Sequence, residues 1–592
     1  MKAMKVNVLR LCGAAVAVLL ALIGSAAGQE GTTGQEDLQA DNPPARVARL
    51  SYIRGNVSFL RAGVDQWSAA ALNFPVTTGD RIYTDSGARA ELEVGNYTVR
   101  LSEHTDLTVT NLNDQILQLG LQQGTLRVSV YRLPAGDTVE VDTPNSAVTV
   151  VEPGDTRVQV DPDGATTLAV YRGSVDVTGS GISQTVQAGQ AVKLSGYDNV
   201  ALLSMQLPRS DDFDRWCQDR DLRISSSRST QYVSPAVPGF DDLDDYGSWE
   251  DVADYGPVWY PAGVAVDWVP YRFGRWVWVG PWGWTWIEAE PWAFCQFHYG
   301  RWVHIGLRWG WLPGPIVPVS VYAPAFVAFI GGPNFAITIG GGPVSLTAWF
   351  PLGPGEPFFP WYHCRETYIR QVNITNIRIV TNITNIINVT NINNVHYAYR
   401  SIATTAVPAN VFRSGLPVAR QVVRLTPQQI EHAQIIPHPY VNPTLRAALP
   451  GKPVSPPLVR PHPSLTAARG APVRGPTGVR APSELPRTAT VSERAPRVAP
   501  APIPAPRLFT RVPPPPPNVP FTVQRPYMAP HPGRYLEPQQ LESLRAGRPA
   551  GPMVDHEFPP HVAPPPHVVA PAPHVVTGPP ARVAPPHPQR KP

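Results

Sequence analysis

The sequence predicts an all-β protein with two folded regions, an export signal before them and a long unfolded tail after them. Three observations predict this class. Short runs of alternating apolar and polar residues, separated by Gly, Asn and Asp turns, fill residues 46–205. Trp, Gly and Pro crowd residues 246–400, and 46 of the 71 prolines lie after residue 407. We therefore expect a β-sandwich or β-roll, then a small Trp-rich β-hairpin repeat domain, then a disordered Pro-rich tail.

Residues 1–27 have the pattern of a signal peptide. Lys2, Lys5 and Arg10 precede an apolar core from Leu11 to Ile23, and small residues follow that core. The apolar core is shorter than the ~20 residues that span a bilayer, so cleavage is favoured over a retained membrane anchor. The sequence predicts an exported chain in the periplasm or at the cell surface, with no stable transmembrane segment in its mature form.

Residues 46–205 contain one short pattern three times, in which a glycine (Gly55, Gly124 or Gly173) leads into an alternating strand. With Thr143-Pro144 and the closing Gly189-Gln190, this region resembles the FecR family of exported regulatory and sensing domains. The resemblance implies a periplasmic β-domain that binds or relays and performs no chemistry. Regulatory members carry a cytoplasmic sigma-factor-binding segment, and the few residues before the apolar core at Leu11 are too short to form one.

Residues 206–245 form an acidic stretch rich in Asp. Asp clusters can bind calcium, but no glycine-containing loop with a closing Glu has EF-hand spacing here. The sequence therefore predicts a solvated linker.

Residues 246–400 begin with short aromatic motifs that repeat. Gly274-Arg275-Trp276 recurs as Gly300-Arg301-Trp302 after 26 residues, and Trp-Gly-Trp recurs after 27. Each unit predicts a short β-hairpin with paired indoles on one strand face. The motifs are similar to a Trp/Tyr-rich bacterial domain of unknown function that follows FecR-like domains, a family that implies architecture and no ligand. The twelve tryptophans of the stretch are Trp249, Trp259, Trp268, Trp276, Trp278, Trp282, Trp284, Trp286, Trp292, Trp302, Trp309 and Trp311.

Some of these aromatic residues are candidates for ligand binding, because each exposed indole offers a large flat apolar face. Guanidinium groups beside the indoles could stack on them. The candidates are Trp276, Trp278, Trp284, Trp286, Arg275 and Arg301. An exported location also permits a disulfide, for which Cys295 and Cys364 are the preferred pair because both lie in aromatic, foldable sequence.

From Asn373 to His396 an Ile or Val recurs at every third residue, usually with Asn before it. A threefold extended path keeps this stripe on one edge, so we expect an extended segment docked along the aromatic domain. An ordinary strand pair remains the alternative. Residues 405–592 are rich in Pro and basic, which predicts disorder and polyproline II.

The sequence offers no convincing catalytic set. Glu288 and Glu290 could form a carboxylate pair of the glycosidase type, but exposed turn charges are the favoured interpretation. Five Cys and His residues between 295 and 364 match no zinc spacing. We expect no cofactor, no metal and no nucleic-acid partner. The first functional hypothesis is a non-catalytic envelope protein that senses or scaffolds by binding another protein. The alternative is a module that binds glycan or peptidoglycan through exposed tryptophans, and an enzyme comes third. Oligomeric state stays open.

Overall fold

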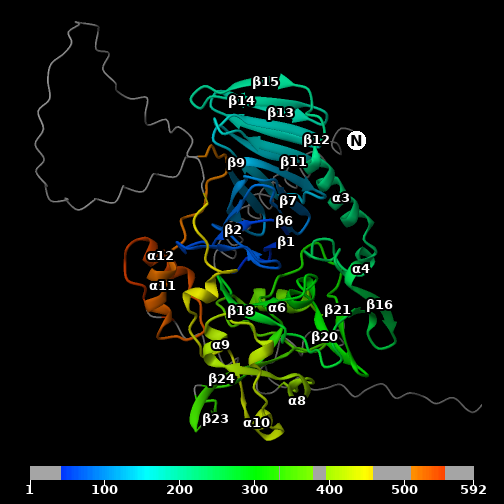
Figure 1. The fold of residues 1–592 in the computed structure, drawn as a ribbon, viewed down its shortest axis with the longest axis vertical. Coiled ribbons are helices and arrows are strands. Elements are labelled where there is room, and N and C mark those ends of the chain that lie inside the picture. The colour runs from blue at the N-terminus through cyan, green and yellow to red at the C-terminus, as the bar shows by residue number, and fades with distance from the viewer. Residues whose placement is uncertain are drawn as a thin grey trace, which may run out of the picture. The chain divides into compact units, whose positions relative to one another are not determined.

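The computed structural model describes residues 42–332, 334–339, 341–377, 395–457, 508–551 and 553, so the predicted signal peptide lies outside the described residues. Strands predominate over helices, and the all-β fold class is confirmed (Figure 1). No helix among the described residues is long and apolar enough to span a membrane.

The first region, called the β-domain below, is one hydrogen-bonded sheet with the main order β15-β14-β12-β11-β10-β9-β7-β6-β1-β4. The remaining strands branch from this path. Strand β8 pairs with β9 and β5, β5 pairs with β2, and β2 pairs with β3, while β13 pairs with β12. The strands are β1 (Ala48–Arg54), β2 (Val57–Leu60), β3 (Trp67–Ala69), β4 (Pro75–Val76), β5 (Arg81–Thr84), β6 (Arg89–Val94), β7 (Tyr97–Leu101), β8 (Asp106–Leu112), β9 (Ile116–Val130), β10 (Thr138–Asp142), β11 (Ser146–Val160), β12 (Thr166–Gly179), β13 (Ile182–Gln187), β14 (Ala191–Ser195) and β15 (Ala201–Met205).

Three long strands carry the sheet from one set of neighbours to the next. The first part of β9 pairs with β8 and β10, and its second part pairs with β7 and β11. Gly124 stands at that change with φ +89°, and Gly173 occupies a similar irregularity in β12 with φ +74°. Only glycine adopts such angles freely, so the recurrent glycines let long strands bend. Gly124 and Gly173 thus mark bends inside long strands, where the sequence suggested turns before separate strands. Gly55 lies in a turn between β1 and β2, as predicted.

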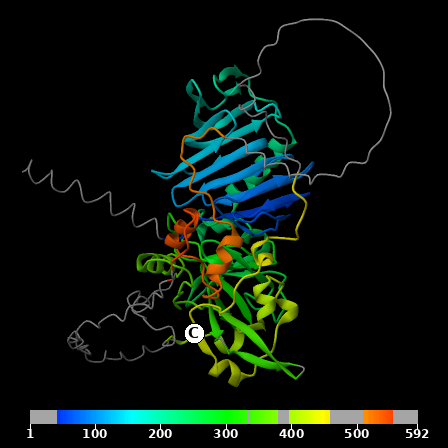
Figure 2. The same cartoon turned by 90° about the vertical axis from the view of Figure 1, so that its left-hand side faces the viewer.

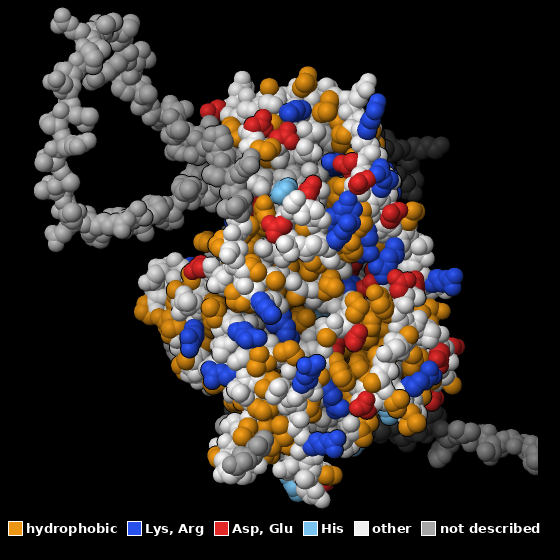
Figure 3. Space-filling view, viewed as in Figure 1, with side chains coloured by type: hydrophobic (Ala, Val, Ile, Leu, Met, Phe, Trp, Pro, Cys, Tyr) orange, Lys and Arg blue, Asp and Glu red, His pale blue; other side chains and the backbone are white. Residues whose placement is uncertain are grey.

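The prediction of a solvated linker over residues 206–245 is wrong. Helix α3 (Asp212–Ser226) begins at Asp211, whose side chain accepts a hydrogen bond from Asp214 N in a capping box. The helix lies along the β-domain, where basic and acidic side chains interleave (Figure 3). Asp214 pairs with Arg157 at 2.9 Å and Asp221 pairs with Arg100 at 2.7 Å. The acidic residues therefore dock a helix onto arginines of the sheet, of which Arg100 is fully buried, and such partners are not visible in local sequence. The short η1 (Arg228–Gln231) and α4 (Leu243–Tyr246) follow.

The Trp-rich region is built from the predicted hairpins. Strands β18 (Gly274–Val279) and β19 (Gly283–Glu288) pair Trp276 with Trp286 and Trp278 with Trp284. Strands β20 (Arg301–Ile305) and β21 (Arg308–Leu312) pair Trp302 with Trp311. A third hairpin, β16 (Gly247–Val252) and β17 (Gly256–Pro261), completes a four-stranded sheet with β20 and β21. The 26-to-27-residue repeat therefore corresponds to the first two hairpins.

Further strands and short helices cover these hairpins. Strand β24 pairs with β22, β23 and β25, and β26 pairs with β22. The elements are α5 (Cys295–His298), β22 (Val327–Gly331), β23 (Ala336–Ile339), β24 (Gly342–Pro351), α6 (Glu366–Ile374), α8 (Arg400–Ala403), β25 (Thr405–Pro408), α9 (Ala409–Arg413), η3 (Ala419–Gln421), α10 (Pro427–His432), β26 (Gln434–Ile436), η4 (Leu445–Ala448), α11 (Phe521–Met528) and α12 (Pro538–Arg545).

Two parts of the predicted disordered tail are folded, which corrects the boundary at residue 405. Residues 405–457 contribute β25 and β26 to the sheet around β24. Residues 508–551 carry α11 and α12, and Met528 and Leu536 are buried. A few large apolar residues between prolines suffice, because the folded body supplies the rest of the core. Residues 458–507 and 554–592 lie outside the described residues, and so does most of the Asn/Ile triplet segment, although Asn373 and Ile374 end α6.

The β-domain and the Trp-rich region share one hydrophobic core, and all described residues belong to one compact unit. A buried polar cluster, called the Arg49 cluster below, lies where the two regions meet. The Arg49 guanidinium donates to Asn73 Oδ1 at 2.9 Å and to Pro291 O at 2.9 Å. It also pairs with Asp242 at 2.5 Å and Glu93 at 3.3 Å. Arg49 thus makes polar contacts with the sheet, the acidic stretch and the Trp-rich region at once.

Candidate functional site

The four tryptophans selected from the sequence are core residues. Trp276, Trp278, Trp284 and Trp286 are each at most 3% exposed. Trp276 alone contacts five other aromatic rings with centroids 5.3–6.2 Å away. No ligand can stack on rings that are covered in this way, so the structure corrects their assignment as a binding surface.

The two candidate arginines also have structural partners. Arg275 donates to the carbonyl oxygens of Leu449 and Pro450 and so ties the chain after η4 to β18. Arg301 is buried, donates to Glu356 O at 3.3 Å, and lies 4.0 Å from the centroid of the Phe326 ring. The predicted stacking on a ring is thus present for Arg301, but on a phenylalanine inside the core.

Cys295 and Cys364 are free thiols in the structure, as is Cys217, so the preferred disulfide is not formed. Cys295 lies at the start of α5 beside the charged Arg49 cluster, and Cys364 lies in the loop before α6. Burial raises the pKa of the Cys364 thiol to about 12. Both thiols are therefore packed as small apolar groups and are poorly ionised.

Glu288 is buried, which the sequence did not predict, whereas Glu290 is half-buried. Glu288 Oε2 accepts a hydrogen bond from Trp286 Nε1 at 2.9 Å. Burial raises the pKa of Glu288 to about 8. Its environment is that of a carboxyl group held neutral inside the core, next to a tryptophan.

The raised pKa of Glu288 predicts how stability depends on pH. The folded state binds a proton more tightly than the unfolded state, so stability falls as pH rises from about 4.5 to about 8. This one group contributes a slope of at most about 1.4 kcal/mol per pH unit. Glu288→Gln keeps an acceptor for Trp286 and removes the proton, so we expect a flatter profile in urea unfolding at pH 5–8. An unchanged profile would contradict a protonated Glu288.

The titratable residues that the structure describes form no cluster with the makings of a metal centre. No group of three or more His, Cys, Asp or Glu side chains in the described ranges could hold a metal ion. His298, one of the residues considered for such a site, is buried and its ring nitrogen contacts Ala323 O at 2.8 Å. Burial lowers the pKa of His298 to about 3, which keeps the ring neutral.

Trp249 is the exception among the twelve clustered tryptophans, because only its ring is not buried. It lines a cleft of about 620 Å³, called the Trp249 cleft below. Its ring lies 4.5 Å from that of Tyr232, measured between centroids, and its Nε1 donates to Ser229 Oγ at 3.0 Å. Together Trp249 and Tyr232 form a partly exposed aromatic wall. The full lining is Arg223, Ser226, Ser227, Arg228, Gln231, Tyr232, Asp241, Asp244, Asp245, Gly247, Ser248 and Trp249.

The rest of the Trp249 cleft is polar and carries both signs of charge. Arg223 pairs with Asp245 at 3.0 Å, and Asp245 is 59% exposed at the rim. Burial raises the pKa of Asp241 to about 8, with the carboxylates of Glu93 and Asp242 adding to the effect. Ser227 Oγ is buried and has no hydrogen-bond partner in the protein. The cleft thus offers donors and acceptors beside an aromatic wall, which suits a ligand with many hydroxyl groups.

Most residues of this cleft belong to the acidic stretch, for which the sequence predicts a solvated linker and no site. A signal was available in Asp211 and Asp214, whose spacing is that of a capping box at a helix start. Arg220 and Arg223 alternate with aspartates along the same helix, which indicates paired charges. Trp249 could not be separated from its neighbours, because all twelve tryptophans share the same local composition.

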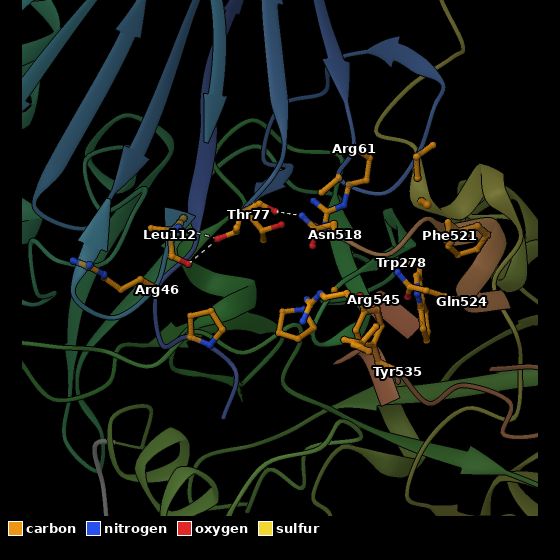
Figure 4. Close-up of a pocket in the computed structure, with 18 residues that line it drawn as sticks. Arg46, Arg61, Thr77, Leu112, Trp278, Asn518, Phe521, Gln524, Tyr535 and Arg545 are labelled. Atoms are coloured by element: carbon orange, nitrogen blue, oxygen red, sulfur yellow. Dashed lines mark hydrogen bonds between the residues drawn. The ribbon is translucent and has the colours of Figure 1, made fainter. Parts of the chain in front are cut away.

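A second cavity, of about 200 Å³, lies between the β-domain, β18 and the C-terminal residues (Figure 4). Arg61 and Thr77 line it from the β-domain, and Trp278 lines it from β18. Tyr535 packs 5.9 Å from the Trp278 ring, measured between centroids. We call it the interdomain cavity. Trp278 therefore lines this cavity, although it is only 3% exposed to solvent.

These features define a β-rich chain whose second region is rich in tryptophan. Residues 240–356 match DUF6600, a family of unknown function. Two solved structures of a Parabacteroides distasonis ATCC 8503 protein, provisionally described as an anti-sigma factor, align with 18% identity and a TM-score of 0.19. The alignment covers 21% of this chain, and the chain spans 59% of that protein's length. No curated protein matches the chain.

Proposed function

We propose that this chain is a non-catalytic sensing or scaffolding module, exported to the cell envelope, that binds a glycan in the Trp249 cleft. The observation that carries the proposal is the partial exposure of Trp249, because the other eleven clustered tryptophans are buried in the core. Export rests on the residues of the N-terminal signal, and the FecR-like resemblance of the β-domain supports a sensing or scaffolding role.

The chemistry of the cleft favours a carbohydrate. Sugar rings place C–H groups on one face, and these pack on aromatic faces such as those of Trp249 and Tyr232. Sugar hydroxyls both donate and accept, so they can satisfy Arg223, Asp245 and Ser227 at once. The cleft volume of about 620 Å³ lies in the usual range for small-molecule sites. Soluble peptidoglycan fragments are the first ligands to test.

Replacing Trp249 with alanine should weaken glycan binding at least tenfold, because the ligand loses its aromatic wall. Binding of peptidoglycan fragments and of neutral and acidic oligosaccharides to the full chain is measured by calorimetry. Asp245→Asn tests the polar rim without disturbing packing and should also weaken binding. Trp216 is the matched control, since it is partly exposed, packs near Tyr52 and lies outside the cleft. If Trp249→Ala binds like the wild type, or no sugar binds, the glycan proposal is abandoned.

A protein partner is the second candidate, and strand β15 favours it. This strand stands at the end of the sheet order, and its Leu203 and Met205 are 67% and 40% exposed. It carries neither the charges nor the prolines that usually protect an edge strand. An extended segment of a partner could continue the sheet there by backbone hydrogen bonds.

A further inference from the structure

Between Leu508 and Phe521 the chain crosses the β-domain in an extended conformation before it enters α11 and α12 (Figure 2). We call these residues the strap. The strap contains a run of five prolines, Pro513–Pro517, with polar and apolar residues on both sides. Its contacts with the β-domain are concentrated at two anchors, one before the prolines and one after them.

The first anchor is formed by backbone hydrogen bonds. Phe509 N donates to Thr143 O at 2.9 Å, as in a β-bridge. Val512 N donates to Glu140 Oε1 at 2.9 Å, and Val512 O accepts from Gln118 Nε2 at 2.7 Å. Glu140 and Gln118 are fully buried in the presence of the strap. Gln118 Nε2 also donates to Thr510 Oγ1 of the strap at 2.8 Å. The two buried polar side chains thus bind mainly the backbone of an extended peptide and, in addition, one hydroxyl side chain.

The second anchor combines a polar contact with apolar burial. Asn518 Nδ2 donates to Thr78 O at 3.2 Å, and Phe521 N donates to Gly63 O at 2.7 Å. Val519 and Phe521 are 4% and 6% exposed. This anchor therefore selects a hydrogen-bonding residue followed by apolar ones.

The β-domain surface is shaped to receive the strap. A Cβ atom added at Gly120 would come within 2.7 Å of Leu508 Cδ1, and one at Gly63 within 2.6 Å of Val519 O. A side chain at Gly79 would collide with the strap as well. At Gly63 the added atom would meet the strap backbone, whereas at Gly120 and Gly79 it would meet the ends of the flexible Leu508 and Asn518 side chains. The strap therefore packs closely in this groove at both anchors, and its backbone position is most restricted at Gly63.

The prolines act as a stiff spacer between the anchors. They have no backbone N–H, so they leave no unpaired donor while they cross the surface largely exposed. In a polyproline II conformation the path from Val512 to Asn518 spans roughly 19 Å, at about 3.1 Å per residue. A fixed spacing lowers the entropy lost when both anchors bind. A separate peptide with the same two anchor segments and proline spacer would therefore still bind the groove.

The groove is not completely filled by the strap. The interdomain cavity of about 200 Å³ is lined by Asn518 and Phe521 of the second anchor together with Arg61 and Thr77 of the β-domain (Figure 4). An occupant with a larger side chain at this anchor could use the remaining space.

We propose that this groove is a recognition site for extended proline-rich peptides, and that the strap is its built-in, competing occupant. Such a peptide has a segment whose backbone N–H and C=O groups bind the first anchor. A run of prolines follows, and then a polar residue and apolar residues that bind the second anchor. The inference is independent of the glycan proposal, since the groove and the Trp249 cleft share no lining residue.

The test uses the full chain with residues 508–520 replaced by a Gly/Ser linker of equal length, so that α11, which begins at Phe521, and α12 stay intact and attached. A fluorescein-labelled peptide with the sequence of residues 508–521 is added and its anisotropy is measured. We expect the replaced variant to bind the peptide at least tenfold more tightly than the wild type, whose groove is occupied. Gly120→Val in the replaced variant should weaken binding, because the added side chain meets Leu508, and a scrambled peptide should not bind.

A milder variant, Leu508→Asp with Asn518→Ala, weakens both anchors while the strap stays in the chain, and hydrogen exchange of residues 508–521 reports its release. It should bind the peptide more tightly than the wild type does. The proposal fails if the released strap leaves a folded chain that binds no peptide. It also fails if the wild type binds as tightly as the variants, because the peptide would then occupy another surface.

Discussion

Arg49→Ala is expected to destabilise the chain by about 3–5 kcal/mol, the usual cost of leaving buried partner charges unpaired. Arg49 is 1% exposed and is the shared partner of Glu93, Asp242, Asn73 and the carbonyl oxygen of Pro291. Burial opposes its charge, but the nearby carboxylates Asp242 and Glu93 outweigh burial and raise its pKa. Without the guanidinium, two carboxylates face each other in the core.

The measurement is urea unfolding of the full chain, followed by tryptophan fluorescence and by circular dichroism. Arg172→Ala is the control, because Arg172 is 64% exposed and lies 3.9 Å from its partner Asp221. A surface pair of this kind contributes about 0–1 kcal/mol. A loss for Arg49→Ala no larger than for Arg172→Ala would contradict the junction described above. Since both regions share one core, we expect the two probes to report a single transition.

The hairpins of the Trp-rich region could be predicted because their signals are local. Gly274 and Gly300 each precede Arg-Trp at the start of a strand, and the paired tryptophans follow at strand spacing. Strand period and turn residues determine such hairpins without any distant partner. The same reasoning could not decide which faces are buried. That depends on Phe329, Trp349 and Phe412, which come from distant elements and cover the rings.

The acidic stretch and the strap are ordered, although their composition predicts a linker and disorder, and one physical reason explains both. Composition reports whether a segment can build its own core, and neither segment can. Asp214 and Asp221 nevertheless find buried arginines on the sheet, and Phe521 finds a cavity already lined by other residues. Docking of this kind depends on a surface that forms elsewhere in the chain. Polar or proline-rich composition therefore excludes independent folding, but it does not exclude an ordered place on a folded body.

Trp276→Ala is expected to cost about 3–5 kcal/mol, the range for removing a large aromatic side chain from a packed core. Trp276 is 1% exposed and touches five rings from five other parts of the chain, so the cavity cannot close by a local shift. Trp216→Ala is the control, because Trp216 is only partly buried and should cost less. Urea unfolding of both variants decides whether the clustered tryptophans are primarily a core.

A second pair of substitutions separates packing from hydrogen bonding in that core. Trp276 Nε1 has no partner in the protein, whereas Trp284 Nε1 donates to Val441 O at 3.0 Å. Trp276→Phe loses ring volume but also removes an unpaired donor, so its cost should be well below that of Trp276→Ala. Trp284→Phe loses similar volume and leaves a carbonyl oxygen unpaired, which adds about 1 kcal/mol or more. Equal losses for the two phenylalanine variants would show that the indole N–H groups contribute nothing to this core.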